Sequence, residues 1–344
     1  MLRSLTKCVP LLAVGLAMGQ TWEPRRSGTK ASLRGVSAVS AKIAWACGTG
    51  GTYIKTVDRG ATWQHGVVGG AEKLDFRGVY ALDDRIAYLL SIGAGDQSRI
   101  YKTTDGGAHW KLQFKNSDPK GFFDEIAFWS PLHGIALGDP VNGRFEILTT
   151  ADGGEHWARE QGPTSLANEG AFAASNSSLF VADANEVWFG SGGAGAARVF
   201  HSTDGGRNWT VATTPIRKDS ANAGIFSLAF RDGLHGIAVG GDYRQPFDPT
   251  HNIAITSDGG KTWREPPGPH PEGFRSAVAF LAGAGLWIAA GPSGSDVSSD
   301  DGNTWTRADG GAYNAISFFS WKIGWAVGPQ GRLAQFSEKP RRAQ

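Results

Sequence analysis

The chain has 344 residues, of which 40% are hydrophobic and 19% are charged. Its 34 basic and 32 acidic residues nearly balance, which excludes a strongly cationic nucleic-acid-binding surface and an acidic disordered chain. The 49 glycines follow no Gly-X-Y period, so they indicate many tight turns and exclude a long helical bundle, while two cysteines exclude a disulfide framework.

The first segment has the pattern of a secretory signal peptide. Arg3 and Lys7 supply positive charge around the start of an apolar run, residues 9–18, that is too short to span a bilayer. Ala17 and Gly19 are the small residues expected before a cleavage site. No later stretch is long and apolar enough to cross a membrane. We therefore expect an exported protein, periplasmic or secreted, without a transmembrane segment in the mature chain.

A short motif, Ser/Thr-x-Asp-x-Gly-x-x-Trp, recurs six times along the rest of the chain. Its first copy runs from Thr56 to Trp63. Its aspartates are, in chain order, Asp58, Asp105, Asp152, Asp204, Asp258 and Asp300. Successive aspartates lie 42 to 54 residues apart, and a period in the forties is typical of propeller blades.

A small apolar strand precedes each motif and ends in glycine in every copy except residues 86–90, but this strand occurs seven times. The last copy, residues 323–328, has no Asp motif after it. The missing outer strand is expected at the other end of the chain, where Thr21 and Trp22 resemble the end of a motif. Pairing of the N-terminal and C-terminal strands in one blade would remove exposed sheet edges. The predicted fold is an all-β, seven-bladed β-propeller with four strands in each blade.

The predicted signal peptide and the single propeller together determine the expected domain organisation. We expect a signal peptide at residues 1–19, a single propeller at residues 20–337 and a C-terminal tail at residues 338–344. The propeller is expected to be a monomer.

The recurring aspartates suit a structural role in hairpin turns. An Asp carboxylate accepts hydrogen bonds from backbone N–H groups a few residues further on, the Gly permits a positive φ, and the Trp packs into the blade. Six equivalent catalytic or calcium-binding sites around a ring make no mechanistic sense. We therefore predict no metal site, no cofactor and no catalytic role for these residues.

Repeats of this form resemble the Asp-box (BNR) repeats of sialidases, other glycosidases and sortilin-type receptors. The whole-chain pattern, with Gly-Trp-Ala-Val-Gly at residues 324–328 and Thr-Asp-Gly-Gly-x-x-Trp at residues 104–110, resembles the photosystem II stability/assembly factor family in its bacterial branch. The resemblance covers about residues 22–337. It implies a seven-bladed propeller that binds protein through an arginine-bearing face.

Departures from the repeat gather on the face opposite the Asp motifs, where the inner strands begin. Arg34, Arg77 and Arg275 share one repeat position, which the other blades fill with Asp124, a residue near Gly170, Phe226 and Asn314. Arg binds carboxylates and phosphates through two parallel hydrogen bonds, although these arginines are equally expected to be solvated or paired with nearby carboxylates. The candidate binding residues are Arg34, Arg77, Asp124, Glu125, Asp139, Arg144, Asp242, Tyr243, Arg275 and Asn314.

Two classes of function remain open. We expect a non-catalytic scaffold or assembly factor whose partner is a protein or peptide, and no nucleic acid. The alternative is a sialidase-like glycoside hydrolase or a glycan-binding propeller.

For a sialidase-like hydrolase, Arg34, Arg77 and Arg275 would have to form the arginine triad of that family. However, Arg77 lacks the Pro expected after it, and no Tyr nucleophile with a Glu partner can be assigned. Glycosidases also need two carboxylates across a cleft. Asp124 or Glu125 with Asp139 or Asp242 would have to supply them, and acidic pairs with shifted pKa values at the channel mouth would favour this alternative.

Overall fold

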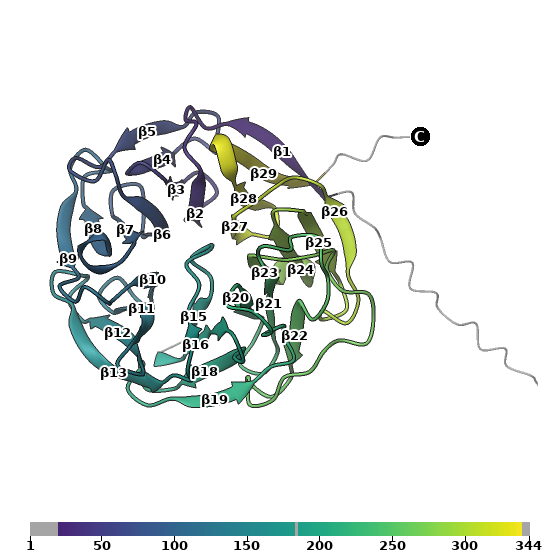
Figure 1. Ribbon diagram of the computed structural model, residues 1–344. Helices are drawn as coiled ribbons and strands as arrows, with labels where there is room; N and C mark the ends of the chain where they lie inside the picture. Colours follow the sequence, from purple (N-terminus) through teal and green to yellow (C-terminus); the bar gives the residue numbers. More distant parts are fainter. Residues whose placement is uncertain (1–19, 183–184, 339–344) are drawn as a thin grey trace, which may run out of the picture.

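The computed structural model describes residues 20–182 and 185–338, so the expected signal peptide and most of the expected tail lie outside these ranges. Seven antiparallel sheets stand side by side in a ring (Figure 1). The predicted seven-bladed propeller is confirmed. Three short 3-10 turns interrupt the strands of the described chain: η1 (Gly95–Gln97), η3 (Ala282–Ala284) and η4 (Pro329–Gly331).

The first three blades follow the chain without interruption. Blade one contains β2 (Leu33–Ala38), β3 (Ala44–Gly48), β4 (Thr52–Thr56) and β5 (Gln64–Val67). Blade two contains β6 (Asp75–Ala81), β7 (Ala87–Ile92), β8 (Arg99–Thr103) and β9 (Lys111–Lys115). Blade three contains β10 (Phe123–Phe128), β11 (Gly134–Val141), β12 (Arg144–Thr150) and β13 (Ala158–Thr164).

Blades four and five share an irregular boundary. Blade four contains β15 (Leu179–Val181), β16 (Val187–Gly190), β18 (Arg198–Ser202) and β19 (Thr210–Thr213). Blade five contains β20 (Ala223–Phe230), β21 (Gly236–Asp242) and β22 (Ile253–Thr256), with its outer strand reduced to a bridge between Ile255 and Arg264. Two short strands extend this sheet at its inner edge: β14 (Glu169–Gly170) and β17 (Gly192–Gly193).

The last two blades close the ring. Blade six contains β23 (Ala277–Leu281), β24 (Leu286–Gly291), β25 (Gly294–Ser298) and β26 (Thr306–Asp309). Blade seven contains β27 (Ala315–Ser320), β28 (Ile323–Val327), β29 (Arg332–Glu338) and β1 (Gln20–Arg26).

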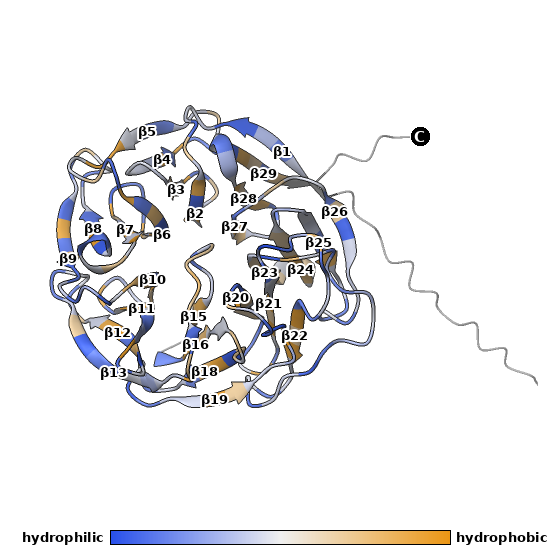
Figure 2. Cartoon of the chain, viewed as in Figure 1, coloured by the Kyte–Doolittle hydropathy of each residue, from blue (hydrophilic) through white to orange (hydrophobic). Residues whose placement is uncertain are grey.

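The core lies between neighbouring blades, because each middle strand is covered on both faces. Every residue of β3 and β21 is buried, whereas the outer strands β5 and β9 are largely exposed. Figure 2 agrees with this difference between middle and outer strands, since the outer strands β5, β9 and β13 are coloured mainly as hydrophilic. The last residue of β3 is a glycine, Gly48, because the Cβ of any other residue there would lie 2.2 Å from the carbonyl oxygen of Ser32.

The ring closes as predicted, by antiparallel pairing of β1 with β29. Trp22 stands opposite Phe336 in this pairing, and the centroids of their rings are 5.1 Å apart. The indole N–H of Trp22 donates to Ser295 Oγ at 3.2 Å in blade six. Because Trp22 is only 5% exposed, the N-terminal strand is anchored into the core between blades six and seven.

The six Asp motifs form one kind of turn, between the third and fourth strands of a blade. In the first turn, Thr56 Oγ1 donates to Asp58 Oδ1 at 2.8 Å and accepts from the N–H of Gly60 at 2.9 Å. The N–H and hydroxyl of Thr62 donate to the two oxygens of Asp58 at 2.9 and 2.6 Å. The residues in the place of Thr62 in the other turns are His109, His156, Asn208, Thr262 and Thr304. The carboxylates therefore cap turns, as predicted.

These turns are expected to make the fold sensitive to acid. Burial opposes ionisation of Asp258, but the hydrogen bonds from Thr262 outweigh it and lower the pKa to about 2. The stabilisation is complete above the unfolded pKa of about 4 and is lost as the pH falls through about 2. Asp258→Asn should lower the free energy of unfolding by about 1–3 kcal/mol at neutral pH.

Urea denaturation at several pH values checks this expectation. The difference in the free energy of unfolding between wild type and Asp258→Asn should shrink as the pH falls from about 4 to about 2. Asp84→Asn, at an exposed position outside the six Asp turns, should change the free energy of unfolding little at any of these pH values. A difference that stays constant with pH, or stoichiometric calcium binding at Asp258, would contradict the capping role.

Candidate functional site

A central cavity of about 610 Å³ opens at the end of the ring where the inner strands begin, opposite the Asp turns. All seven blades or the connections between them contribute to its wall. Its lining residues are Arg34, Arg77, Phe122, Asp124, Asp139, Ala171, Phe172, Ala173, Ala174, Ala221, Phe226, Tyr243, Phe274, Ser276, Pro292 and Asn314. The variable face of the repeat is therefore hollowed at its centre.

Six of the ten predicted site residues line this cavity. They are Arg34, Arg77, Asp124, Asp139, Tyr243 and Asn314. The other four lie elsewhere, and they are Glu125, Arg144, Asp242 and Arg275.

A bulge at the start of the inner strand explains why one repeat position supplies cavity residues. The pairing of β2 with β3 shifts register around Arg34, and the pairing of β6 with β7 shifts around Arg77. The same shift occurs at Asp124 in β10 and at Phe226 in β20. A bulge turns one side chain away from the regular alternation, so the same position in successive blades faces the ring axis.

The two cavity arginines differ in how far they are paired. Arg77 donates from Nε to Asp75 Oδ2 at 3.0 Å and from Nη1 to the carbonyl oxygen of Ala173 at 2.7 Å. Arg34 forms no ion pair within residues 20–182 and 185–338, and its buried Nε has no hydrogen-bond partner there. Burial, followed by the nearby charge of Arg77, lowers the pKa of Arg34 to about 10, so the guanidinium stays charged at neutral pH. Arg34 is thus a cation with unused donors.

Two carboxyl groups converge on the same wall. Asp124 is 1% exposed, and its Oδ2 has no partner among the described residues. Burial, then the charges of Asp139 and Glu125, raises the pKa of Asp124, while Arg77 acts in the opposite direction. Asp139 Oδ1 accepts from the N–H of Ala171 at 2.8 Å, and burial raises its pKa to about 6. The pair therefore holds protons more readily than ordinary aspartates do.

The opposite side of the cavity is aromatic. Phe172 stacks on Phe226 with ring centroids 4.0 Å apart, and Phe274 meets Phe226 edge-on at 4.7 Å. Tyr243 lies 6.1 Å from Phe226 and is 44% exposed. We call these four residues the aromatic wall. Of them, only Tyr243 was among the ten candidate residues, Phe226 was named only at the shared repeat position, and Phe172 and Phe274 were not anticipated.

An irregular segment, residues 171–178, crosses the ring between β14 and β15, and we call it the plug. Asn176 bonds to the backbone of Ile126 in blade three at 2.9 and 3.0 Å. Ser175 Oγ donates to the carbonyl oxygen of Ser276, beside blade six, at 2.6 Å. Figure 1 shows the teal chain leading into β15 reaching the middle of the ring.

The plug corrects one assignment from the sequence. Gly170 does not begin the inner strand of blade four. It lies in β14, where it pairs with Gly192 of β17, and the inner strand β15 begins only at Leu179. The signal for the plug was the long interval of 52 residues between Asp152 and Asp204, where earlier intervals are 47.

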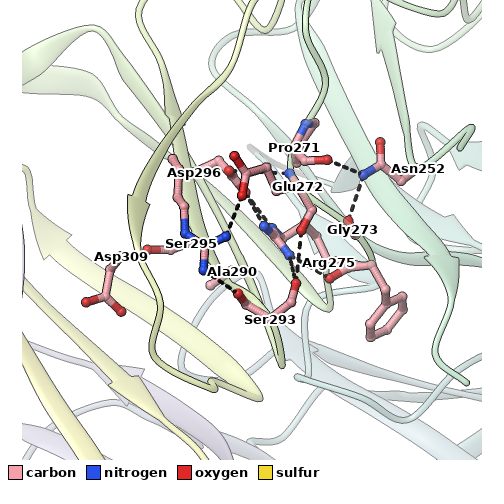
Figure 3. Close-up of polar contacts among 12 residues, drawn as sticks. Asn252, Pro271, Glu272, Gly273, Arg275, Ala290, Ser293, Ser295, Asp296 and Asp309 are labelled. Atoms are coloured by element: carbon pink, nitrogen blue, oxygen red, sulfur yellow. Dashed lines mark hydrogen bonds and ion pairs between the residues drawn. The ribbon is translucent and has the colours of Figure 1, made fainter. Parts of the chain in front are cut away.

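Arg275 does not point into the cavity, contrary to expectation. It is fully buried, and its Nε donates to Asp296 Oδ2 at 2.6 Å. Its Nη1 donates to Ser293 Oγ at 2.7 Å and to the carbonyl oxygen of Phe274 at 2.9 Å. Figure 3 shows Arg275 directed into this network of polar contacts with Asp296 and Ser293. The start of β23 has no bulge of the kind found at Arg34 and Arg77, and Asp296 on β25, two strands further out in blade six, holds Arg275 inside the blade.

The remaining three candidates also have local structural partners. Glu125 is buried toward blade four, where Ser178 Oγ donates to its Oε1 at 2.9 Å. Asp242 accepts from Ser220 Oγ and from the N–H of Arg244, both at 2.8 Å. Arg144 is exposed and lines a separate hollow of about 630 Å³ beside β12 and β13.

Glu125 makes a further pH effect testable. Burial raises its pKa to about 8, although Ser178 opposes the rise. The folded protein therefore holds this proton, and the associated stability is complete below the unfolded pKa of about 4.3 and is lost as the pH rises through about 8. Glu125→Gln should melt at a higher temperature than wild type at pH 9 but not at pH 5. Calorimetry at both values checks this, and an equal shift at both would contradict it.

Within the described ranges, no group of three or more His, Cys, Asp or Glu side chains is arranged to hold a metal ion. The same ranges contain no helix able to cross a membrane.

The fold and the cavity together define a class, a seven-bladed propeller with a central ligand-sized cavity on one face. No protein-family model and no curated protein matches the chain. Among solved structures, YCF48 bound to D1 peptide is similar, with a TM-score of 0.67 and 18% identity over 92% of this chain and 96% of that one.

Two further structures show the breadth of this likeness. YCF48 from Cyanidioschyzon merolae has a TM-score of 0.64 and 18% identity, over 93% of this chain and 99% of that one. The GH74 enzyme of Niastella koreensis has a TM-score of 0.62 and 16% identity, over 91% of this chain but 53% of that one. At these identities the comparisons establish the fold, which is shared by proteins of different function.

Proposed function

We propose that this chain is an extracytoplasmic, non-catalytic scaffold that binds a protein or peptide partner in the central cavity. The observation that carries the proposal is Arg34, a charged guanidinium with unused donors on the wall of a cavity that also has an aromatic side. Such a group favours a carboxylate ligand. The fold similarity to YCF48 bound to D1 peptide supports a peptide as the ligand.

The proposal includes membership of the bacterial branch of the photosystem II assembly factor-like, Asp-box proteins. The six capped turns and the Arg34–Arg77 register support it. It also includes export, with cleavage before Gln20, where β1 begins. Mass spectrometry of the protein recovered from the cell envelope would test the cleavage position.

The binding function is tested with random short peptides displayed with free carboxyl ends. The wild-type protein should enrich peptides that carry an accessible carboxylate. Arg34→Ala should weaken the best of them by about ten- to a hundredfold in a calorimetric titration, because a charge-assisted contact is lost. Arg144→Ala is the matched control, since Arg144 is exposed and lies outside the cavity. Equal affinity for Arg34→Ala and wild type would refute the proposal, provided that both melt at the same temperature.

The hydrolase is a second candidate, because Asp124 and Asp139 converge in the cavity with raised pKa values. A retaining or inverting glycosidase pairs a protonated acid with an ionised carboxylate on the two sides of the scissile bond. Here both groups lie on one wall of the cavity rather than on its two sides, which favours the scaffold. Turnover of a chromogenic glycoside that is lost in Asp124→Asn would establish the hydrolase instead.

A further inference from the structure

We infer that the aromatic wall is the specificity subsite of the cavity, and that it receives an aromatic side chain of the partner peptide placed next to the carboxylate bound by Arg34. This inference rests on the proposed function and adds the chemistry of the bound residue. The four residues of the wall are Phe172, Phe226, Phe274 and Tyr243.

The wall presents ring surface to the cavity rather than closing on itself. Phe226 and Phe274 are almost fully buried and form its base, where they meet edge-on at 4.7 Å. Phe172, on the plug, covers one face of Phe226. Tyr243 stands 6.1 Å from Phe226 and remains 44% exposed at the cavity mouth. An entering ring can therefore contact Tyr243 and the partly exposed Phe172, which the buried base holds in place.

The two sides of the cavity come from different blades. Arg34 and Arg77 belong to blades one and two, whereas Phe226 lies in β20 of blade five and Tyr243 in the loop between β21 and β22 of the same blade. Both sides line the same volume of about 610 Å³, which lies within the usual size of ligand sites. One ligand residue with a polar group and an apolar side chain can thus use both sides.

Charge argues against a basic side chain on the aromatic wall. Arg77 already neutralises Asp75, and Arg34 is unpaired within the described ranges. Burial favours the neutral form of Asp124. The aromatic wall itself carries no carboxylate, so a Lys or Arg side chain placed on it would lose its hydration without gaining an ion-pair partner there, whereas a neutral ring would meet no such cost.

An aromatic side chain fits better than an aliphatic one for a geometric reason. Two aromatic rings that meet edge-on or offset-stacked attract each other more strongly than the burial of the same apolar area would predict. The difference corresponds to about a two- to tenfold gain in affinity. The wall already combines a stacked pair and an edge-on pair around Phe226. We therefore expect Phe, Tyr or Trp to be preferred over Leu or Ile.

The test uses the same displayed random peptides. Wild type should enrich an aromatic residue within one or two positions of an acidic residue or of the free carboxyl end. Tyr243→Ala should reduce the affinity of the best peptide by about two- to tenfold. It should leave unchanged the affinity of the same peptide with its aromatic residue replaced by Ala. Phe247→Ala is the matched control, because Phe247 lies in the same loop between β21 and β22, is 80% exposed and is absent from the cavity wall.

The possible outcomes separate the two proposals. Acidic peptides that depend on Arg34 but show no aromatic preference, or that prefer Leu or Ile, would overturn the aromatic subsite and leave the binding function standing. Enrichment that is indifferent to Arg34, or no enrichment, would overturn both. Equal losses for Tyr243→Ala and Phe247→Ala would also overturn the subsite. Melting curves of both variants show whether the fold is intact.

Discussion

Arg275→Ala is expected to lower the free energy of unfolding by about 3–5 kcal/mol, because it removes one partner of a buried ion pair. Asp296, which is 1% exposed, would lose the hydrogen bond from Arg275 Nε and remain as an uncompensated buried carboxyl group. Burial already raises the pKa of Asp296, and the charge of Arg275 opposes that rise. Without Arg275 the folded state would hold the proton on Asp296 more tightly, so the loss should be smaller in acid than at neutral pH.

Urea denaturation at neutral pH measures this loss, and a double-mutant cycle identifies its cause. Arg275→Ala combined with Asp296→Ala should be less destabilised than the sum of the two single variants, since neither charge is then left alone. Arg144→Ala, which removes an exposed arginine, should have a small effect. Losses of similar size in Arg275→Ala and Arg144→Ala would show that the buried pair has no structural role.

Trp22→Ala should lower the free energy of unfolding by about 3–5 kcal/mol, the usual effect of emptying a buried aromatic site. Trp22 contacts the rings of Phe336, Phe318 and Tyr313, with centroid distances of 5.1, 5.8 and 5.5 Å. Deleting residues 20–26 should cost at least as much, because blade seven then loses the whole of β1.

Thermal and urea unfolding of four proteins, wild type and three variants, checks the role of this strand. Trp22→Phe should fall between wild type and Trp22→Ala, since it keeps a ring but loses the hydrogen bond to Ser295. Leu166→Ala, at an exposed position outside blade seven, serves as the control. A Trp22→Ala variant that melts with wild type would mean that β1 does not hold the ring together.

The sequence predicted the fold well because its signals are local. Each Asp turn is specified within eight consecutive residues, and Thr56, Asp58 and Thr62 satisfy one another without help from distant parts of the chain. Repetition of such turns fixes the number and order of the strands. Ring closure was predicted because the sequence contains seven of the small apolar strands but only six Asp motifs, which leaves one outer strand to be supplied by the N-terminus.

The candidate site was only partly predictable, because a shared repeat position fixes the backbone but not the direction of the side chain. Arg34 and Arg77 face the cavity from bulges, whereas Arg275 turns toward Asp296. The sequence does not show that β25 places a carboxylate beside Arg275 and that Phe274 lines the cavity instead. The plug was missed for a related reason: Ser175 and Asn176 bond to residues 101 and 50 positions away, and no local pattern reports such contacts.

The pairing of β1 with β29 also determines the order in which the ring can be completed. Trp22 and Phe336 meet across more than 300 residues of chain, so this contact forms only after everything between them has been made and arranged. Contacts of such long sequence separation slow folding, because the entropy of closing the chain is lost before the contact is gained. Until then β29 presents an unpaired edge, because β1 is its outer partner, and other chains can add strands at such an edge. The feature that makes the finished ring stable therefore leaves the unfinished ring with an edge that is open to aggregation.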